Sequence, residues 1–239
     1  MKELIKGAGE LGIVFNASQV KQFELYYQEL IEWNRKINLT AITDYSSVQI
    51  KHFLDSLTLA LLLPGREVER PDFNIIDVGT GAGFPGLPLK ILFPGPRLVL
   101  VEPTAKKTDF LRYIIKILKL ENVEVLNSRA EEAAHLPLYR EQFSLVLSRA
   151  VALLPILVEL TLPFCRIGGR FVAQKKGEFD REISQAEKGI ATLGGKLDKI
   201  KKIELGELYD VRYLVIIGKI SPTPSKYPRR PGMPRRRPI

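Results

Sequence analysis

The sequence predicts an α/β protein with a mostly parallel, doubly wound sheet. Between residues 73 and 192, short apolar β-like runs alternate with helix-like segments, which is the pattern of parallel sheets. Two further β-like runs, 196–205 and 212–220, follow with only a short link, so we expect a terminal antiparallel pair. Helix-like segments precede the first strand. We therefore expect an N-terminal helical cap (1–68), a Rossmann-like domain (69–220) and a basic Pro/Arg-rich tail (221–239).

Composition narrows the protein class. The 239 residues are 45% hydrophobic and 26% charged, which is typical of a globular chain with a sizeable core. Cys165 is the only cysteine, and with just two histidines beside it no Cys/His metal site is expected. The sequence contains no signal peptide and no apolar run of membrane-spanning length. We expect a cytoplasmic protein without a membrane partner, and a monomer.

The net charge of +9 is unevenly distributed. Residues 221–239 contain no acid and six basic residues, so this segment supplies most of the excess positive charge. Six of the sixteen prolines also lie there. This composition predicts an extended tail without a core of its own.

Two helices are expected in the cap. Three glycines in residues 1–16 predict an irregular start, and apolar residues at helical spacing then predict a helix over 17–35. After a loop, the capping-box pattern Ser46 to Gln49 opens a second helix that ends near Leu63. His52 and Asp55 are three residues apart on this helix and could contact each other. They are either a surface pair or part of a site.

The most informative stretch follows the first predicted strand, 73–78. Three glycines at alternate positions, Gly79, Gly81 and Gly83, separate this strand from a helix-like run, 87–93. Glycine permits positive φ and close backbone approach, and a helix start offers unpaired N–H groups. Strand, glycine turn and helix together predict a nucleotide-binding cradle.

This cradle allows two cofactor interpretations. Gly81 to Gly86 fits the dinucleotide pattern G-x-G-x-x-G, whereas Asp77 to Gly83 reads D-x-G-x-G-x-G. A carboxylate at the end of the strand suits a ligand with an ammonium group or hydroxyls and repels a pyrophosphate. The pattern therefore favours S-adenosylmethionine over NAD. A purely structural glycine turn is the third interpretation.

Polar residues follow three of the later strands. Glu102 ends the second strand, where an acid accepts hydrogen bonds from ribose hydroxyls of either cofactor. Ala130–Glu131 follow the third strand and are the expected adenine contact. Arg149 ends the fourth strand at the predicted cleft, and Lys175 ends the fifth. The helix over 104–119 has a basic face, for which solvation is the simpler explanation.

The order of several short motifs resembles one family. The motifs are Trp33-Asn34, Asn38-Leu39-Thr40, His52-Phe-Leu-Asp55-Ser56, the glycine turn Asp77 to Gly86, Ser128-Arg-Ala-Glu-Glu132 and Ser148-Arg-Ala150. Over about residues 23–220 they resemble the glucose-inhibited division protein B family, the bacterial small-subunit ribosomal RNA guanine-N7 methyltransferases. The resemblance implies a class I methyltransferase fold and S-adenosylmethionine as donor. With the candidates from strand ends, the expected cofactor residues are Asp77, Gly79, Gly81, Gly83, Phe84, Glu102, Ala130, Glu131 and Arg149.

The implied chemistry requires little of the protein. Guanine N7 has a free in-plane lone pair, so methyl transfer needs alignment and no removal of a proton. We expect no proton-transfer residue, although Arg149 and Lys175 are candidates for contacts with phosphate or guanine O6. The implied partner is small-subunit ribosomal RNA or the assembling subunit. RNA-binding candidates are Arg35, Lys36, Lys106, Lys107, Arg112, Arg229, Arg230, Arg235, Arg236 and Arg237.

Other functions remain open from the sequence. A methyltransferase that acts on a small molecule would share the cradle but have no use for a basic tail. A non-catalytic RNA-binding assembly factor would keep the basic surface without a donor site. An NAD dehydrogenase is a more distant alternative.

Overall fold

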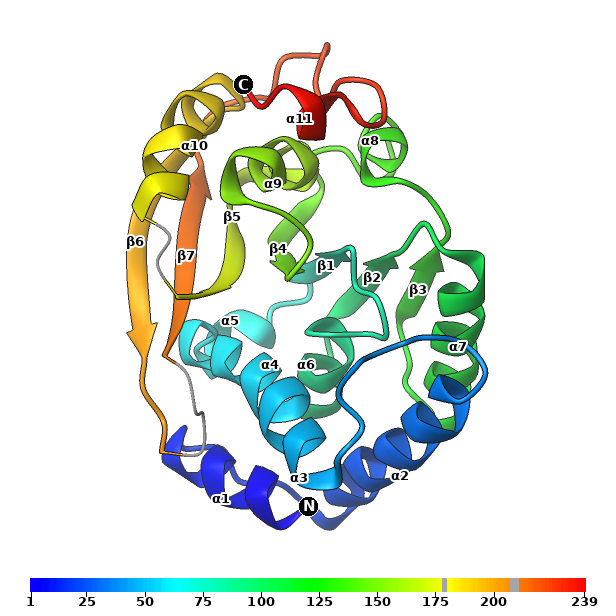
Figure 1. The fold of residues 1–239 in the computed structure, drawn as a ribbon. Helices are drawn as coiled ribbons and strands as arrows, with labels where there is room; N and C mark the ends of the chain where they lie inside the picture. Colours follow the sequence, from blue (N-terminus) through cyan, green and yellow to red (C-terminus); the bar gives the residue numbers. More distant parts are fainter. Residues whose placement is uncertain (178–179, 207–210) are drawn as a thin grey trace.

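A computed structural model describes residues 1–177, 180–206 and 211–239. Within these residues seven strands form one sheet in the order β3-β2-β1-β4-β5-β7-β6 (Figure 1). The strands are β1 (Asn74–Val78), β2 (Arg97–Val101), β3 (Val123–Leu126), β4 (Phe143–Arg149), β5 (Cys165–Lys176), β6 (Gly195–Ile203) and β7 (Arg212–Lys219). β1 to β5 are parallel, and β7 runs antiparallel to β5 and β6. The predicted sheet and its terminal antiparallel pair are confirmed.

The strands are apolar on both sides because both faces of the sheet are covered. Successive residues point to opposite faces, so Ile75 and Leu147 join one core whereas Ile76 and Val146 join the other. The first core also takes in the cap helices, and the second lies under the helices that follow β3. The sheet is thus the middle layer of three.

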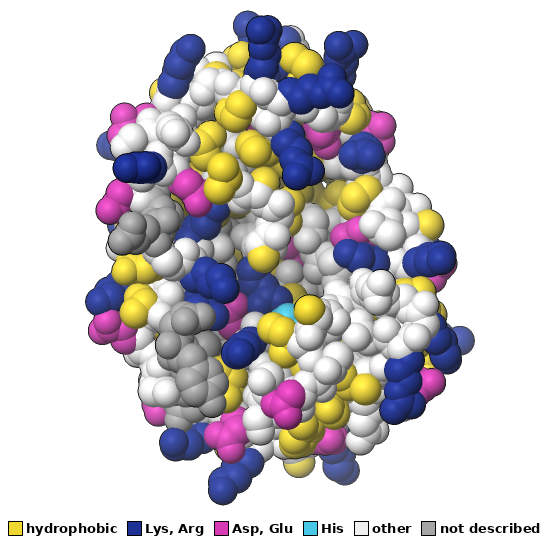
Figure 2. Space-filling model, in the orientation of Figure 1, with side chains coloured by type: hydrophobic (Ala, Val, Ile, Leu, Met, Phe, Trp, Pro, Cys, Tyr) yellow, Lys and Arg dark blue, Asp and Glu magenta, His cyan; other side chains and the backbone are white. Residues whose placement is uncertain are grey.

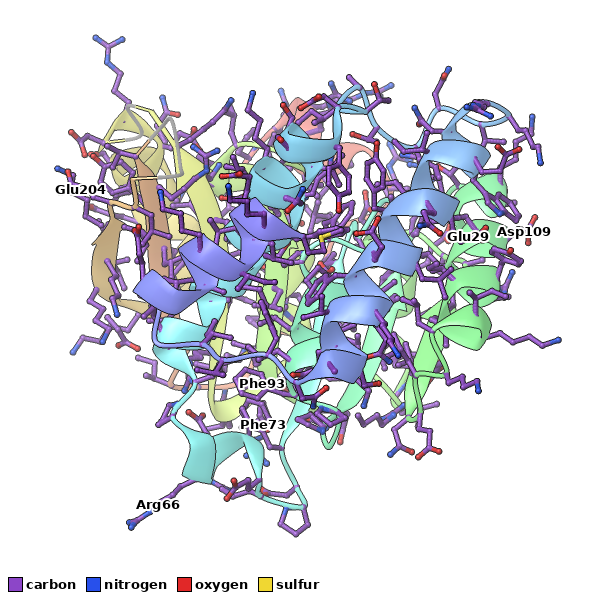
Figure 3. All side chains as sticks on the ribbon, turned by 90° about the horizontal axis from the view of Figure 1, so that it is seen from below. Glu29, Arg66, Phe73, Phe93, Asp109 and Glu204 are labelled. Atoms are coloured by element: carbon purple, nitrogen blue, oxygen red, sulfur yellow. The ribbon has the colours of Figure 1, made fainter. Side chains whose placement is uncertain are left out.

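The helices of the first face are α1 (Lys2–Glu10), α2 (Ala17–Asn34), α3 (Tyr45–Val48), η1 (Gln49–Leu54), α4 (Asp55–Leu57), η2 (Thr58–Leu62), α5 (Gly65–Val68), α6 (Gly86–Leu92) and α7 (Ala105–Ile117). Those of the other face are α8 (Ala130–Ala133), α9 (Leu154–Thr161), η3 (Leu162–Phe164), α10 (Asp180–Thr192) and α11 (Met233–Arg236). The first two residues of the helix predicted over 178–192 lie outside the described residues. Figure 3 shows α2 beside α7, with Glu29 and Asp109 labelled on them. The Tyr113 hydroxyl joins the two helices by donating to the Glu29 carboxylate at 2.9 Å.

The irregular start predicted for residues 1–16 is wrong, because α1 runs through Gly7 and Gly9. Packing explains the glycine at position 7. A Cβ there would lie 2.3 Å from the Leu54 side chain, so only glycine lets the two helices approach this closely.

The second cap helix is present, but its predicted capping box is wrong. Asp44 is the N-cap, and its carboxylate accepts a hydrogen bond from the Ser47 N–H at 2.8 Å. Gln49 instead ties α1 to this helix, since its Oε1 accepts from the Leu4 N–H at 3.3 Å. The helix passes through a π-helical stretch, η1, which contains His52 and ends directly before Asp55. Such π-helical stretches are frequent at functional sites.

The prediction of an extended tail without packing is also wrong. The tail, red in Figure 1, lies along α8, α9 and α10 and contains α11. The Arg140 guanidinium donates to the carbonyls of Tyr227 and Thr223 at 2.8 and 2.9 Å. Arg229 forms an ion pair with Glu159 at 2.6 Å. Glu159 is fully buried on α9, so part of the tail's charge balances an interior carboxylate that composition cannot reveal.

None of the helices described here combines the length and apolar character needed to cross a bilayer.

Replacing Arg229 by Ala is expected to lower the free energy of unfolding by about 3–5 kcal/mol, because it leaves the Glu159 carboxylate buried without its cation. Arg230→Ala is the matched control. Arg230 is exposed, so its loss should change stability by about 0.5 kcal/mol or less. Urea unfolding of the two variants measures the difference. Equal stabilities would mean that the Arg229–Glu159 pair does not anchor the tail.

Candidate functional site

The glycine turn lies where the strand order reverses, between β1 and its neighbours β2 and β4. Gly79 and Gly81 have φ of +73° and +60°. A Cβ on Gly79 would lie 2.5 Å from a Val151 methyl, whereas a Cβ on Gly81 would meet nothing within 4 Å. The turn therefore leaves open space beside its backbone, as expected of a ligand cradle.

Asp77 stands behind this turn and holds its shape. Its carboxylate is fully buried and accepts hydrogen bonds from the Thr80 hydroxyl at 2.7 Å and the Gly86 N–H at 2.9 Å. Both bonds use Oδ2, and Oδ1 has no hydrogen-bond partner among the described residues. Burial raises the pKa of Asp77 to about 6. A cation near the turn would stabilise its ionised form.

Three aromatic rings join the cap to the glycine turn. The Phe84 ring stacks on Tyr26 of α2, with centroids 5.4 Å apart, and on His52 of η1, with centroids 4.6 Å apart. The Tyr26 hydroxyl also donates to the Ala82 carbonyl at 2.5 Å. The conformation of the turn thus depends on both cap helices.

His52 is neutral in this site. Burial, followed by the positive charge of Arg149, lowers its pKa to about 3. The Arg149 guanidinium donates to Nδ1 at 3.3 Å, so Nε2 carries the ring proton and donates to the Thr40 hydroxyl at 2.8 Å. The Asn34 side chain fixes the loop that bears Thr40, because its Oδ1 accepts from the N–H groups of Leu39 and Thr40.

Asp55 holds two arginines at the carboxyl edge of the sheet. Its Oδ2 accepts from Arg149 at 2.8 Å, and its Oδ1 accepts from Arg212 Nε at 2.7 Å. Arg149 also donates to the Lys51 carbonyl at 3.0 Å and lies 5.3 Å from the Phe84 ring centroid. His52 and Asp55, which the sequence placed on one helix face, both contact Arg149.

Two adjoining cavities open at this edge. The first, which we call the glycine-turn cavity, has a volume of about 390 Å³, and the second, the cap cavity, of about 510 Å³. His52, Arg149 and Ala150 line both and form a shared wall. Ala150 has a φ of +56°, a strained conformation that is often found at functional sites. In Figure 2 this face is hollowed near its centre, and Lys and Arg side chains gather at one side of the hollow.

Most of the expected cofactor residues lie together. Gly79, Gly81, Phe84, Glu102 and Arg149 line the glycine-turn cavity. Asp77 and Gly83 lie behind the turn, with Gly83 against Leu87 and Tyr26. Glu131 lines a neighbouring cavity of about 430 Å³ that is partly covered by the tail and shares Val151 with the first. Ala130 begins α8 beside it.

Lys175 lies in the cap cavity, but its ammonium group is already engaged. It donates to the Glu182 carboxylate at 2.6 Å and to the Ala152 carbonyl at 3.0 Å. This ion pair gives Lys175 a structural contact on the cavity rim.

The expected RNA-binding residues fall into two groups. Arg35 and Lys36 pair with Glu32, Arg112 pairs with Asp109, and Arg229 pairs with Glu159. Lys107 lines the glycine-turn cavity, and Arg235 lines the neighbouring one. The exposed arginines of the tail are Arg230, Arg235, Arg236 and Arg237, and Lys106 is exposed on α7.

Sequence reasoning missed Thr40, Gln174 and Arg212, which the fold brings to the two cavities. Gln174 had a usable signal, because it is polar at the end of an apolar strand, as Arg149 is. Arg212 had none, since only strand pairing brings β7 beside β5. In the described ranges, no three His, Cys, Asp or Glu side chains gather closely enough to hold a metal ion.

Comparison with known sequences gives a consistent result. A sequence model of the GidB family, described as rRNA small subunit methyltransferase G, matches residues 19–209. The chain is 52% identical to the ribosomal RNA small subunit methyltransferase G of Dehalococcoides mccartyi, and the match covers 100% of both chains. It is 47% identical to the protein of the same name in Pelotomaculum thermopropionicum, over 100% of this chain and 99% of the relative.

Solved structures with lower identity share the fold. TYW2 of M. jannaschii in complex with AdoMet is 18% identical and superposes with a TM-score of 0.51 over 65% of this chain and 75% of its own. A geranyl diphosphate C-methyltransferase from Streptomyces coelicolor is 14% identical, with a TM-score of 0.53 over 82% and 98%. The predicted class I methyltransferase fold is confirmed.

The low pKa of His52 predicts a pH dependence of stability. The unfolded chain binds one more proton than the folded chain between pH 6.5 and about 3, so stability falls as the pH falls through this window. Relative to a His52→Gln variant, the wild-type protein should lose about 2 kcal/mol of unfolding free energy between pH 7 and pH 5. Urea unfolding at the two pH values measures the loss. Identical pH dependence of both proteins would contradict a buried neutral histidine.

Proposed function

We propose, because the chain belongs to the GidB family of small-subunit ribosomal RNA methyltransferases, that it methylates N7 of a guanine in that RNA with S-adenosylmethionine as donor. The observation that carries the proposal is the pair of adjoining cavities. One lies on the glycine turn and is suited to the donor, and the other opens beside it and is free for an acceptor. The shared wall puts the two ligands within reach of each other.

The residues of the glycine-turn cavity fit this donor. Glu102 Oε2 accepts from the Gly81 N–H at 3.1 Å, and its Oε1 accepts from the Thr104 N–H at 2.9 Å. A carboxylate oxygen can accept a second hydrogen bond, so Glu102 is held in place and still able to bind ribose hydroxyls. The unpartnered Oδ1 of Asp77 adds negative charge behind the turn, which suits an ammonium or sulfonium cation.

The adenine end of the donor is assigned to the side of the cavity where Pro103 and Val151 lie. Val151 also borders the neighbouring cavity, which Glu131 lines. Ala130 and Glu131 therefore stay in the proposal as residues next to the adenine. Glu131 is also fixed by the tail, since its carboxylate accepts from the Gly232 N–H at 3.1 Å.

The donor supplies a methyl group on a positively charged sulfur, and guanine N7 supplies the lone pair. The protein therefore has to bring the two atoms to about 3–3.5 Å in line, and no residue has to remove a proton. The site agrees with this requirement. His52 is buried as the neutral ring, Arg149 is permanently charged, and Lys175 is paired with Glu182. Arg149 is thus a binding and orienting residue.

The alternatives fit the site less well. A pyrophosphate in the glycine-turn cavity would meet both Glu102 and Asp77, which argues against NAD. A non-catalytic assembly factor would not need two joined cavities. The exposed arginines of the tail favour a polyanionic substrate over a small molecule. Small-subunit RNA or the assembling subunit is therefore the proposed partner, and a cytoplasmic monomer stays a prediction.

The methyl-transfer reaction is the direct test. Incubation with labelled S-adenosylmethionine and small ribosomal subunits should place label in the RNA, and borohydride and aniline should then cleave the chain at the labelled site. Cleavage identifies N7-methylguanine. Label at a nucleotide that resists cleavage would refute the N7 assignment, and binding of the donor without any label in RNA would favour a small-molecule acceptor.

The exposed tail arginines are expected to bind RNA phosphates. Deleting 221–239 would also remove the packed contacts of Thr223 and Arg229, so the sharper variant replaces Arg230, Arg235, Arg236 and Arg237 by Gln. RNA affinity should fall, and the slope of log affinity against log salt should flatten by about 0.7–0.9 for each phosphate that the variant leaves unneutralised. Affinity for S-adenosylmethionine should stay unchanged. A wild-type slope in the variant would remove the tail from the RNA interface.

A further inference from the structure

We propose that the cap cavity receives the acceptor guanine and that Arg149 and Gln174 recognise its O6 and its N1–H, which makes Gln174 a specificity-determining residue. This inference rests on the proposed function and adds the identity of the groups that select the base. The argument depends on the order of the strands, on the free N–H groups of Arg149 and on one unpartnered oxygen of Gln174.

The position of the methyl group fixes where N7 must lie. A donor on the glycine turn faces the cap cavity across the wall formed by His52, Arg149 and Ala150. The acceptor N7 therefore has to lie at this wall, and the remainder of the base extends into the cap cavity. Its volume of about 510 Å³ lies within the range of about 300–1,000 Å³ for small-molecule sites. A nucleotide turned out of its stack can enter such a cavity.

Strand pairing places the two recognition residues side by side. Arg149 of β4 and Gln174 of β5 are direct partners in the register. Neighbouring strands lie about 4.8 Å apart, so the sequence of groups from the glycine turn outward is shared wall, Arg149, Gln174. The edge of guanine presents N7, O6 and N1–H in the same sequence. With N7 at the wall, O6 faces Arg149 and N1–H faces Gln174.

Arg149 has the donors that O6 requires. A guanidinium carries five N–H groups, and three of them donate to the Asp55 carboxylate, the Lys51 carbonyl and His52 Nδ1. The other two have no partner within 1–177, 180–206 and 211–239. Asp55 acts as the positioning residue, because it holds the guanidinium against the wall of both cavities.

Gln174 presents the complementary acceptor. Its Nε2 donates to the Asp55 carbonyl at 2.7 Å and to the Thr58 hydroxyl at 3.2 Å, and these bonds fix which way the amide points. The side chain lines the cap cavity and is only 7% exposed, and its buried Oε1 has no hydrogen-bond partner in the described part of the chain. A buried acceptor without a donor is unfavourable, and the N1–H of guanine would satisfy it.

The pair Arg149 and Gln174 discriminates between purines. Guanine offers an acceptor at O6 and a donor at N1, which match a donating arginine and an accepting amide. Adenine offers an amino donor and an N1 acceptor at the same places, so both contacts become repulsive. Both purines have N7, so recognition has to use these neighbouring positions.

Two substitutions separate recognition from structural support. Gln174→Met and Gln174→Glu both remove the Nε2 donor, but only Glu keeps an acceptor. We expect kcat/KM for methylation of unmodified small ribosomal subunits to fall about tenfold to a hundredfold in the Met variant and to stay within a few fold of wild type in the Glu variant. Affinity for S-adenosylmethionine, measured separately, should be the same in all three proteins. An undiminished Met variant, or an equal loss in both, would overturn the role of Oε1.

A binding measurement on the wild-type protein does not depend on how the variants fold. With the protein saturated with S-adenosylhomocysteine, guanosine and inosine monophosphates should bind alike, because both have O6 and N1–H, and adenosine monophosphate should bind several-fold more weakly. Equal binding of all three would overturn the proposal. A protein that binds the donor but methylates no RNA would instead refute the proposed function, which distinguishes the two failures.

Discussion

The stack of Tyr26, Phe84 and His52 is the contact on which the rest of the site depends. Phe84 belongs to the glycine turn, whereas its two partners come from α2 and η1 of the cap. Because aromatic rings pack at defined separations, the stack fixes the turn relative to the cap helices. The cap is therefore part of the site, and the two cavities meet where its helices face the carboxyl edge of the sheet.

The polar groups around this stack are arranged for binding and orientation. Asp55 joins Arg149 and Arg212 across β4, β5 and β7, and Arg149 in turn contacts His52. Burial keeps the histidine neutral, so the shared wall has a fixed cation and no group that exchanges protons near neutral pH. A lone-pair acceptor needs no more than this, because alignment supplies most of what such a transfer requires.

The tail shows how one basic segment serves two purposes. Arg229 balances the buried carboxylate of Glu159, and backbone groups of the tail bind Arg140 and Glu141. These contacts hold the neighbouring arginines on the surface next to the glycine-turn cavity. A docked tail presents its charges at fixed places, which lowers the entropic cost of binding a polyanion relative to a disordered tail.

Local patterns in the sequence were enough to predict the order of strands and helices, the glycine turn and the polar residues at strand ends, because these depend on periodicity and on glycine's backbone freedom. They could not predict α1, where Gly7 serves packing against Leu54, or the docking of the tail on Glu159. The Phe84 stack, the shared wall and the neighbouring positions of Arg149 and Gln174 were also beyond them. Those features join residues far apart in the chain, and which distant side chains meet is set by the packing of the folded protein.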